Sequence, residues 1–419
     1  MLKDVSILSY DEDILKWMDS HRNDIIALER KLIQTKSVNG NESQAAKLVA
    51  EECEKDGLKV ELVEPAPERV SVVARYKGTA GKPKVIWYTH YDTLPAGEES
   101  NWKHPPFSAT IDDDWIYGRG AHDNKTATCA SIMAFRAVKN LGIKLKGDLV
   151  FTHVADEERG GKFGFKNLID KGYGEGIDCL FYPHGGPPGQ LTIAANGSRK
   201  FKITVKAPPV AEGPTPFAGP EARLFRFERS NAILEAVKII PRLEKLADEV
   251  RTRKYRLPGT DSTMVSRFNI NMCHAYLADN APPKVCDLLI DRRWTPAETA
   301  EQTDQEVRQV IDDLKAEDPK FDAQLTVIPE MDLSVSAADS ELVKVIQRSA
   351  KRLIGYEPKP AGGSHSSDHG FFNTKYRKPL ASYGIGGENA HSPNERVKVE
   401  DVILTAKLHG LIMVGLLGC

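Results

Sequence analysis

Three consecutive carboxylates, Asp156, Glu157 and Glu158, follow an apolar run in the stretch FTHVADEERGG. The apolar approach through residues 150–154 is typical of a buried strand, so the acids are expected to leave the protein interior together. Neighbouring negative charges raise one another's pKa unless a positive charge faces them. The chain has 57 basic and 59 acidic residues, so this compensating charge is expected to be local. We therefore predict that the acidic turn faces a metal cation.

Adjacent acids can serve one metal centre in different roles. Gly160 and Gly161 follow them and allow the sharp turn that this requires. One glutamate can bind the metal, while the other accepts a proton from metal-activated water. Bound Zn²⁺ lowers the pKa of water from about 15.7 to about 7, within reach of a carboxylate base.

Two further stretches supply metal-ligand chemistry. WYTHYDTLP places His90 and Asp92 two residues apart on an extended segment, so both side chains share one face. In one interpretation His90 binds a metal through one ring nitrogen, and Asp92 accepts the N–H of the other. In the alternative interpretation, His90 and Asp92 are a histidine–aspartate pair on the surface and bind no metal. Asp123 stands immediately before a predicted helix, where a carboxylate is ordinarily a cap, but its two oxygens can also bridge two cations.

Two histidines complete the predicted ligand set. His184 follows an apolar strand, and His391 lies in a glycine-rich loop before the last helix; either alone is more often structural or exposed. Together with His90, Asp123 and Glu158 they form a nitrogen and oxygen set suited to Zn²⁺, Mn²⁺ or Co²⁺. If Asp123 bridges, one metal takes His90 and His184 and the other takes Glu158 and His391.

Bulk properties narrow the class of protein. A chain of 419 residues predicts about two domains, and a net charge of -2 argues against a nucleic-acid partner. The six scattered cysteines are interpreted as reduced core residues. The N-terminus lacks a signal-peptide apolar block, and the longest apolar run, residues 411–417, is too short to span a bilayer. We expect a cytoplasmic protein without a membrane partner.

Periodicity predicts the elements that position these residues. Alternating helices and strands before residue 197 favour an α/β fold. Helices are expected at 11–38, 42–57, 124–142 and 163–171, and strands at 60–63, 70–76, 85–90, 148–154 and 179–182. From residue 201 the order becomes β-α-β-β-α-β, with strands at 201–206, 263–277, 285–294 and 323–328 and helices at 231–250 and 302–314. After Met331 a helix capped by Asp339 and a last helix from Val399 resume the first pattern.

These patterns predict an α/β catalytic domain formed by residues 1–197 and 332–419, with an inserted α+β lid domain at 198–331. The order of the inserted elements is that of a ferredoxin-like unit.

The chain resembles the metallopeptidase family that includes carboxypeptidase G, acetylornithine deacetylase, succinyl-diaminopimelate desuccinylase and the aminoacylases. The matching stretches occur in family order over nearly the whole chain: His90-Tyr91-Asp92, WKHPPF, YGRGAHD, DEERGG, AGGSHSSD and AHSPNE. The resemblance implies that Glu157 is the general base, that Glu158 is a ligand, and that one or two divalent metals, most often zinc, are bound. It also implies a lid that commonly forms a homodimer.

Two departures from the family pattern concern the substrate. His184 stands where most members have an acid, as in the branch that hydrolyses ureido and carbamoyl amides. The lid segment VKAPPVAEGPTPFAGPEARLF lacks the histidine that usually stabilises the oxyanion, so His274 or Arg293 is a candidate substitute. Arg293 is also expected to hold a substrate carboxylate, and the loop with His365 and Asp368 to line the pocket.

Three functions remain open from the sequence. The leading hypothesis is a metal-dependent hydrolase that cleaves the amide of an N-acyl amino acid or a small dipeptide-like substrate. The second is an aminohydrolase that releases ammonia from an activated aromatic amine or ureido compound. The third is a non-catalytic, metal-stabilised binding protein, against which the presence of Glu157 counts.

Overall fold

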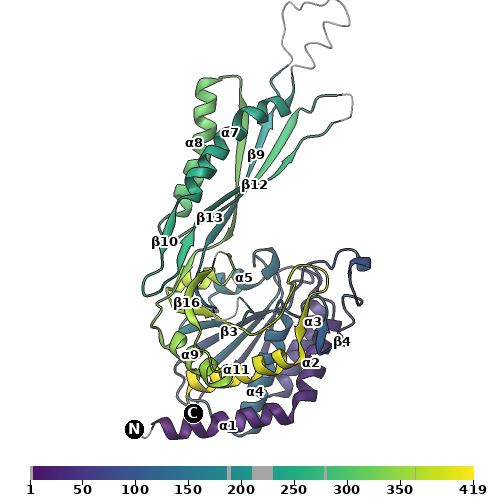
Figure 1. Ribbon diagram of the computed structural model, residues 1–419, viewed down its shortest axis with the longest axis vertical. Coiled ribbons are helices and arrows are strands. Elements are labelled where there is room, and N and C mark those ends of the chain that lie inside the picture. Colours follow the sequence, from purple (N-terminus) through teal and green to yellow (C-terminus); the bar gives the residue numbers. More distant parts are fainter. Residues whose placement is uncertain (1–2, 186–189, 210–229, 278–280, 364) are drawn as a thin grey trace, which may run out of the picture.

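The computed structural model describes residues 3–185, 190–209, 230–277, 281–363 and 365–419. A large α/β unit carries both ends of the chain, and a smaller unit with its own sheet and helices rises from it (Figure 1). The predicted class, α/β with an inserted α+β lid, is confirmed by this arrangement. The exact limits of the insertion, 198–331, stay a prediction.

The large unit is built on one mixed sheet with the path β1-β2-β6-β3-β7-β17-β8-β15, to which β16 adds beside β8. Its strands are β1 Lys59–Val63, β2 Ser71–Tyr76, β3 Lys84–His90, β6 Asp148–Val154, β7 Cys179–Tyr182, β8 Gln190–Ala195, β15 Ser334–Val335, β16 Lys359–Gly363 and β17 Leu380–Ser382. The pairs β6/β3, β3/β7 and β7/β17 are parallel. Every residue of β6 is buried, which explains its continuous apolar sequence.

Helices cover both faces of this sheet. The larger core lies under α1 Lys3–Ser20, α2 Arg22–Gln34, α3 Ser43–Lys55, α4 Lys125–Asn140, α9 Glu341–Ile354 and α11 Val399–Leu417. The smaller core on the other face contains side chains of α5 Phe165–Asp170 and α10 Gly370–Tyr376. Because two layers of helix bury the central strands, the ends of these strands are where their polar residues emerge.

The inserted unit is a four-stranded antiparallel sheet of order β12-β13-β9-β14 with two helices and a separate apolar core. Its elements are β9 Gly197–Lys206, α7 Ala232–Arg251, β12 Arg267–His274, β13 Val285–Trp294, α8 Ala300–Glu317 and β14 Asp322–Met331. This order is the predicted β-α-β-β-α-β unit. The strand β13 alternates exposed or half-buried residues with buried ones, as expected for a sheet covered on one face.

Short elements complete the described chain. A three-stranded sheet joins β4 Thr110–Asp112, β5 Trp115–Tyr117 and β18 Arg396–Lys398, and a two-stranded sheet joins β10 Lys254–Arg256 and β11 Thr263–Val265. The 3-10 turns are η1 Glu99–Asn101 and η2 Glu157–Arg159. Among the described residues, none of the helices has the length and apolar character needed to cross a bilayer.

Four local predictions were wrong. The helix expected at 11–38 is two helices, α1 and α2, separated at His21, and the strand expected at 263–277 is divided between β11 and β12 in different sheets. The N-cap of α9 is Ser340, whose hydroxyl accepts from the Val343 N–H, and not Asp339. The six cysteines are free as predicted, but Cys273 is exposed and not in the core.

Candidate metal centre

The predicted ligands come from five segments that meet at the carboxyl ends of the parallel strands. His90 is the last residue of β3, Glu158 lies in η2 just after β6, and His184 follows β7. Asp123 precedes α4, and His391 belongs to the loop between β17 and β18. Side chains at this edge of an open α/β sheet converge because the connecting loops all leave the strands in one direction.

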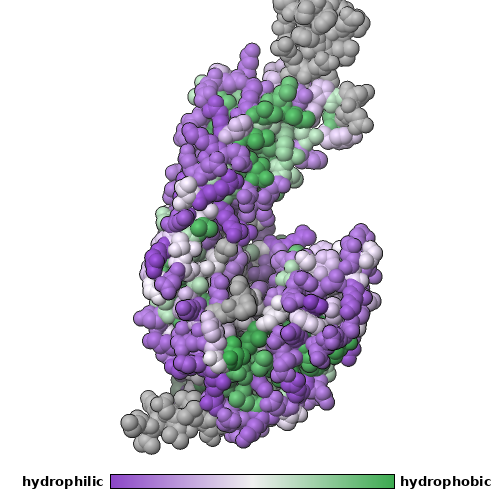
Figure 2. Space-filling model, viewed as in Figure 1, coloured by the Kyte–Doolittle hydropathy of each residue, from purple (hydrophilic) through white to green (hydrophobic). Residues whose placement is uncertain are grey.

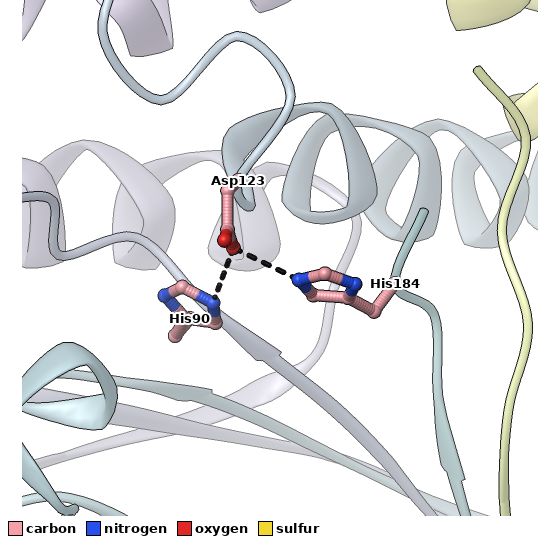
Figure 3. Close-up of side chains that lie close together, drawn as sticks. All are labelled: His90, Asp123 and His184. Atoms are coloured by element: carbon pink, nitrogen blue, oxygen red, sulfur yellow. Dashed lines mark hydrogen bonds and ion pairs between the residues drawn. The ribbon is translucent and has the colours of Figure 1, made fainter. Parts of the chain in front are cut away.

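The first cluster consists of His90, Asp123 and His184, which point toward one another (Figure 3). The Asp123 Oδ1 atom lies 3.0 Å from Nε2 of His90 and 3.1 Å from Nε2 of His184. The other ring nitrogen of His184 is 2.5 Å from the Gly185 carbonyl oxygen, which leaves Nε2 directed at the carboxylate.

The second cluster uses the other oxygen of the same aspartate. His391 Nε2 lies 3.2 Å from Asp123 Oδ2 and 3.0 Å from Glu158 Oε2. His391 has a positive φ of 64°, which the turn of the glycine-rich loop imposes on it. Asp123 therefore faces both clusters, one with each oxygen, as a bridging carboxylate would.

The residues present fit a divalent cation. Four ligands about 2.1 Å from a tetrahedral ion stand roughly 3.4 Å from one another, close to the separations found here. The fully buried His90 has carboxylate oxygens of Asp92 and Asp123 beside its two ring nitrogens, at 3.4 and 3.0 Å, but neither contact has the geometry of a hydrogen bond. A buried ring nitrogen that makes no hydrogen bond is costly unless something else, such as a metal ion, satisfies it.

The pKa shifts show that the clusters favour a positive charge. Burial alone would raise the pKa of Asp123, but His184, His391 and His90 together hold it well below its usual range. Hydrogen bonds to Asp123 and Glu158 raise the pKa of His391 to about 10. Burial raises the pKa of Glu158 to about 7. These pKa shifts mean that a positive charge on the imidazoles stabilises the buried carboxylates. A bound cation would stabilise the same carboxylates, because it also offsets the cost of burying their negative charge.

Glu157 lies beside the first cluster and outside both groups of ligands. Its Oε2 atom is 3.9 Å from His90 Nε2, and the Ser367 hydroxyl donates to its Oε1 atom at 3.0 Å. Burial is the main reason that its pKa is raised, and His90 opposes the shift. Asp368, directly after Ser367, is buried next to it and accepts a hydrogen bond from the Tyr88 hydroxyl.

Asp92 supports the turn that carries the two glutamates. Its carboxylate accepts from the backbone N–H groups of Glu157 and Glu158, each at 3.2 Å, and from the Asn39 amide at 3.0 Å. Its Oδ1 atom is 3.4 Å from His90 Nδ1. Asp92 thus lies beside the ring of His90, and it also fixes the position of the acidic pair; its role as acceptor of the His90 ring N–H stays a prediction.

The third acid of the opening stretch does not face the clusters. Asp156 bonds to Nη2 of Arg69, and its other oxygen accepts from the Phe163 N–H at 2.8 Å. Arg69 also bonds to the buried Glu42 through Nη1 at 2.7 Å. The expectation that all three acids face a metal is therefore wrong for Asp156, whose counter-charge is an arginine. No spacing pattern in the sequence connects Arg69 to this turn.

Glu395 was also not anticipated. This buried carboxylate accepts from the backbone N–H groups of Gly120, His122 and Asp123, each at 3.0 Å, and from Arg119 Nη1 at 2.7 Å. It fixes the loop that presents Asp123 to both clusters. The sequence contained a signal, because Glu395 ends the AHSPNE motif that carries His391.

The predicted substrate residues divide into two sets. A pocket of about 610 Å³ contains Arg293 together with Glu157, Glu158 and His391. His365 is not among the residues that line this pocket, although its neighbour Ser366 is. Burial, followed by the charges of His184 and Arg293, lowers the pKa of His365 to about 4. His274 is different: it ends the edge strand β12, opposite Asp287, and is not among the residues that line this pocket.

Comparison with known proteins adds the family context. Residues 86–414 match the model described as Peptidase family M20/M25/M40. A succinyl-diaminopimelate desuccinylase of Hydrogenovibrio crunogenus is 25% identical and aligns over 94% of this chain and 99% of its own. An N-formyl-4-amino-5-aminomethyl-2-methylpyrimidine deformylase of Halalkalibacterium halodurans is 26% identical over 96% of each chain.

Solved structures share the fold. A di-peptidase from Saccharomyces cerevisiae has a TM-score of 0.77 at 17% identity, covering 98% of this chain and 99% of its own. A dinuclear metal-binding peptidase of Bacillus subtilis has a TM-score of 0.69 at 18% identity, covering 95% and 99%.

Arg69→Met tests the role of the buried arginine. We expect the free energy of unfolding, measured by chemical denaturation, to fall by about 3–5 kcal/mol, because two buried carboxylates lose their counter-charge. The matched control is Arg75→Met, which breaks the exposed pair with Glu61 and is expected to cost at most about 1 kcal/mol. Equal losses in the two variants would contradict the assignment.

Proposed function

Because this chain belongs to Peptidase family M20/M25/M40, we propose that it hydrolyses the amide C–N bond of an N-acyl amino acid or a small dipeptide-like substrate. Family membership makes it a metal-dependent hydrolase, which leaves the non-catalytic alternative without support. The observation that carries the proposal is the Asp123 carboxylate between the two clusters, with the separate acid Glu157 beside them.

The proposed ligands are His90, Asp123 and His184 for one cation and Asp123, Glu158 and His391 for the other. The nitrogen and oxygen donors favour zinc, with manganese or cobalt as alternatives. When bound, such a cation supplies polarisation of the scissile carbonyl and activation of water for attack.

Glu157 is the proposed general base. Its buried carboxylate has a raised pKa, which suits a group that takes a proton and later returns it. In this role Oε2, the oxygen nearer His90, accepts the proton of the attacking water and passes it to the leaving nitrogen. The hydrogen bond from Ser367 to Oε1 holds the other oxygen away from the reaction.

Lid residues provide the proposed contacts to the substrate. Lys200 of β9, Asn271 of β12 and Arg293 of β13 line the pocket above Glu157 and His391. A guanidinium and an ammonium at this place suit the carboxylate of an amino-acid product. His365 is a proposed contact of the reacting carbonyl. The two relatives, a desuccinylase and a deformylase by name, are consistent with an acyl amide as substrate.

Ammonia release from an activated amine stays the second candidate. The observation that favours it is His184 in place of the acid that most family members have, together with a lid segment that lacks the usual histidine. Residues 210–225 of that segment lie outside the described residues.

We further propose that the lid forms a homodimer. In the part of the lid that the structure describes, β12 is an edge strand with no strand paired to its outer side, and apolar side chains are exposed around it and on α7. They are Ile233, Leu234, Val237, Met272, Tyr276 and Leu277. Figure 2 shows an apolar patch on this unit. Large exposed apolar patches are typical of interaction surfaces. A cytoplasmic location stays a prediction.

Glu157→Gln tests the base. The amide keeps the size of the side chain but cannot accept the proton, so turnover should fall by about 10²-fold or more while metal content stays the same. Activity would be measured with a set of N-acyl amino acids, ureido acids and aromatic amines, scored for free amine and ammonia. Glu98→Gln, on an exposed loop, is the control. Unchanged turnover would reject Glu157 as the base.

His184→Ala tests the ligand set independently of the substrate. We expect a lower metal-to-protein ratio after dialysis, measured by elemental analysis, because one cluster loses a ring nitrogen. His104→Ala is the matched control, since His104 pairs with Asp112 away from both clusters. A ratio equal to that of the unmodified protein would remove His184 from the ligands.

Leu234→Glu tests the dimer. Leu234 is 55% exposed on α7, so the change adds a charge to the surface without disturbing the lid core. We expect sedimentation to show a dimeric unmodified protein and a variant with the mass of one chain. A monomeric unmodified protein, or a variant that stays dimeric, would contradict this surface as the interface.

A further inference from the structure

A second cavity lies where the lid meets the large unit. This junction cavity has a volume of about 880 Å³. It is lined by the segment after Glu158, by α10, by the first residues of β9, and by the last residues of β13 and β14. Its volume is within the range of about 300–1,000 Å³ that is typical of small-molecule sites. Arg159, Gly160, Ser198 and Met331 line both this cavity and the pocket that contains Glu157, so the two spaces adjoin.

The junction cavity carries an excess of positive charge. Its basic residues are Arg159, Lys162, Lys166, Arg199 and Lys375, and its acidic residues are Asp170 and Asp332. A cavity lined mainly by one sign of charge concentrates ligands of the opposite sign. This charge distribution therefore favours an anionic ligand.

Several of these cations already have partners within the protein. Lys166 pairs with Asp170 at 2.6 Å, Arg199 pairs with Asp304 at 3.1 Å, and Lys375 donates to the Ile169 carbonyl at 2.6 Å. Arg159 and Lys162 differ, since neither forms an ion pair with an acid in the part of the chain that the structure describes. Their charges are available to a ligand, and Arg159 stands at the boundary of the two spaces.

Aromatic rings line the same cavity. Lys162 lies 5.2 Å from the ring centre of Phe163, Lys166 lies 5.5 Å from that of Phe371, and Arg199 lies 5.8 Å from that of Trp294. Basic residues on a fully solvated surface are common, and they do not by themselves indicate a ligand. Here the basic side chains share a concave wall with aromatic rings, an arrangement suited to a ligand with an apolar body and a charged end.

We propose that the junction cavity is a subsite for the acyl part of the substrate, that this part ends in a carboxylate, and that Arg159 determines this specificity. The inference rests on the proposed amide hydrolysis. Arg159 lines both spaces, so an acyl group that reaches from Glu157 into the cavity would pass beside it. Lys200 and Arg293 then hold the amino-acid carboxylate in the neighbouring pocket.

The first experiment compares matched acyl groups on one amino acid: succinyl with butyryl, glutaryl with valeryl, and adipoyl with hexanoyl. Each pair has the same chain length and differs by a terminal carboxylate. We expect the unmodified enzyme to prefer the acidic member in kcat/KM by about tenfold or more in at least one pair. Arg159→Met should reduce this ratio toward one, and Lys171→Met, at an exposed position outside both spaces, should leave the ratio unchanged. A ratio that Arg159→Met does not alter, or no preference in the unmodified enzyme, would overturn the proposal.

The second experiment requires no turnover, so it separates failure of the subsite from failure of the proposed reaction. Calorimetric titration of the metal-loaded protein would use 4-phenylbutyrate as probe and its neutral amide as control. We expect 4-phenylbutyrate to bind the unmodified protein and Lys171→Met alike, and to bind Arg159→Met about tenfold more weakly. The neutral amide should bind all three proteins equally. Binding of 4-phenylbutyrate that is absent, or that ignores Arg159, would overturn the subsite even if amides are hydrolysed.

Discussion

The arrangement depends on one buried carboxylate that faces imidazoles on both sides. Asp123 meets His90 and His184 with one oxygen and His391 with the other, all at 3.0–3.2 Å. Together with Glu157 and Glu158, Asp123 places several carboxylates at the end of a buried sheet. Their burial is unfavourable unless positive charge lies beside them. The parallel strands solve the geometric part of this problem, because their carboxyl ends bring five distant segments to one place.

A layer of hydrogen bonds behind the clusters keeps these side chains in position. Glu395 accepts from the loop that carries Asp123, while Asp92 accepts from the turn that carries Glu157 and Glu158. The Arg69–Asp156 pair anchors the start of that turn. Such supporting contacts orient a metal ligand and limit its motion, and so influence affinity without touching the ion.

The sequence predicted the elements that repeat a pattern and the residues that belong to local motifs. The strands 148–154, 179–182 and 285–294 were predicted with the bounds that the structure shows, because apolar runs and alternation are local signals. The predicted ligands are near one another, although their roles stay proposals. Arg69 and its partner Asp156 are 87 positions apart, and no local pattern can report such a pair. The short strand β8 was missed for a similar reason, since its place in the sheet depends on neighbours far along the chain.

The proposed catalytic residues and most of the proposed substrate contacts lie on different parts of the fold. The clusters and Glu157 stand on the ends of buried strands, where a change in backbone position would disturb several ligands at once. The pocket and the junction cavity are lined in part by β9, β13 and β14 of the lid, which has its own apolar core. Side chains on these strands can therefore differ between related enzymes without moving the proposed metal ligands. Arg159 is an exception, because it follows Glu158 directly; its proposed role would couple the choice of acyl group to the position of the acidic pair.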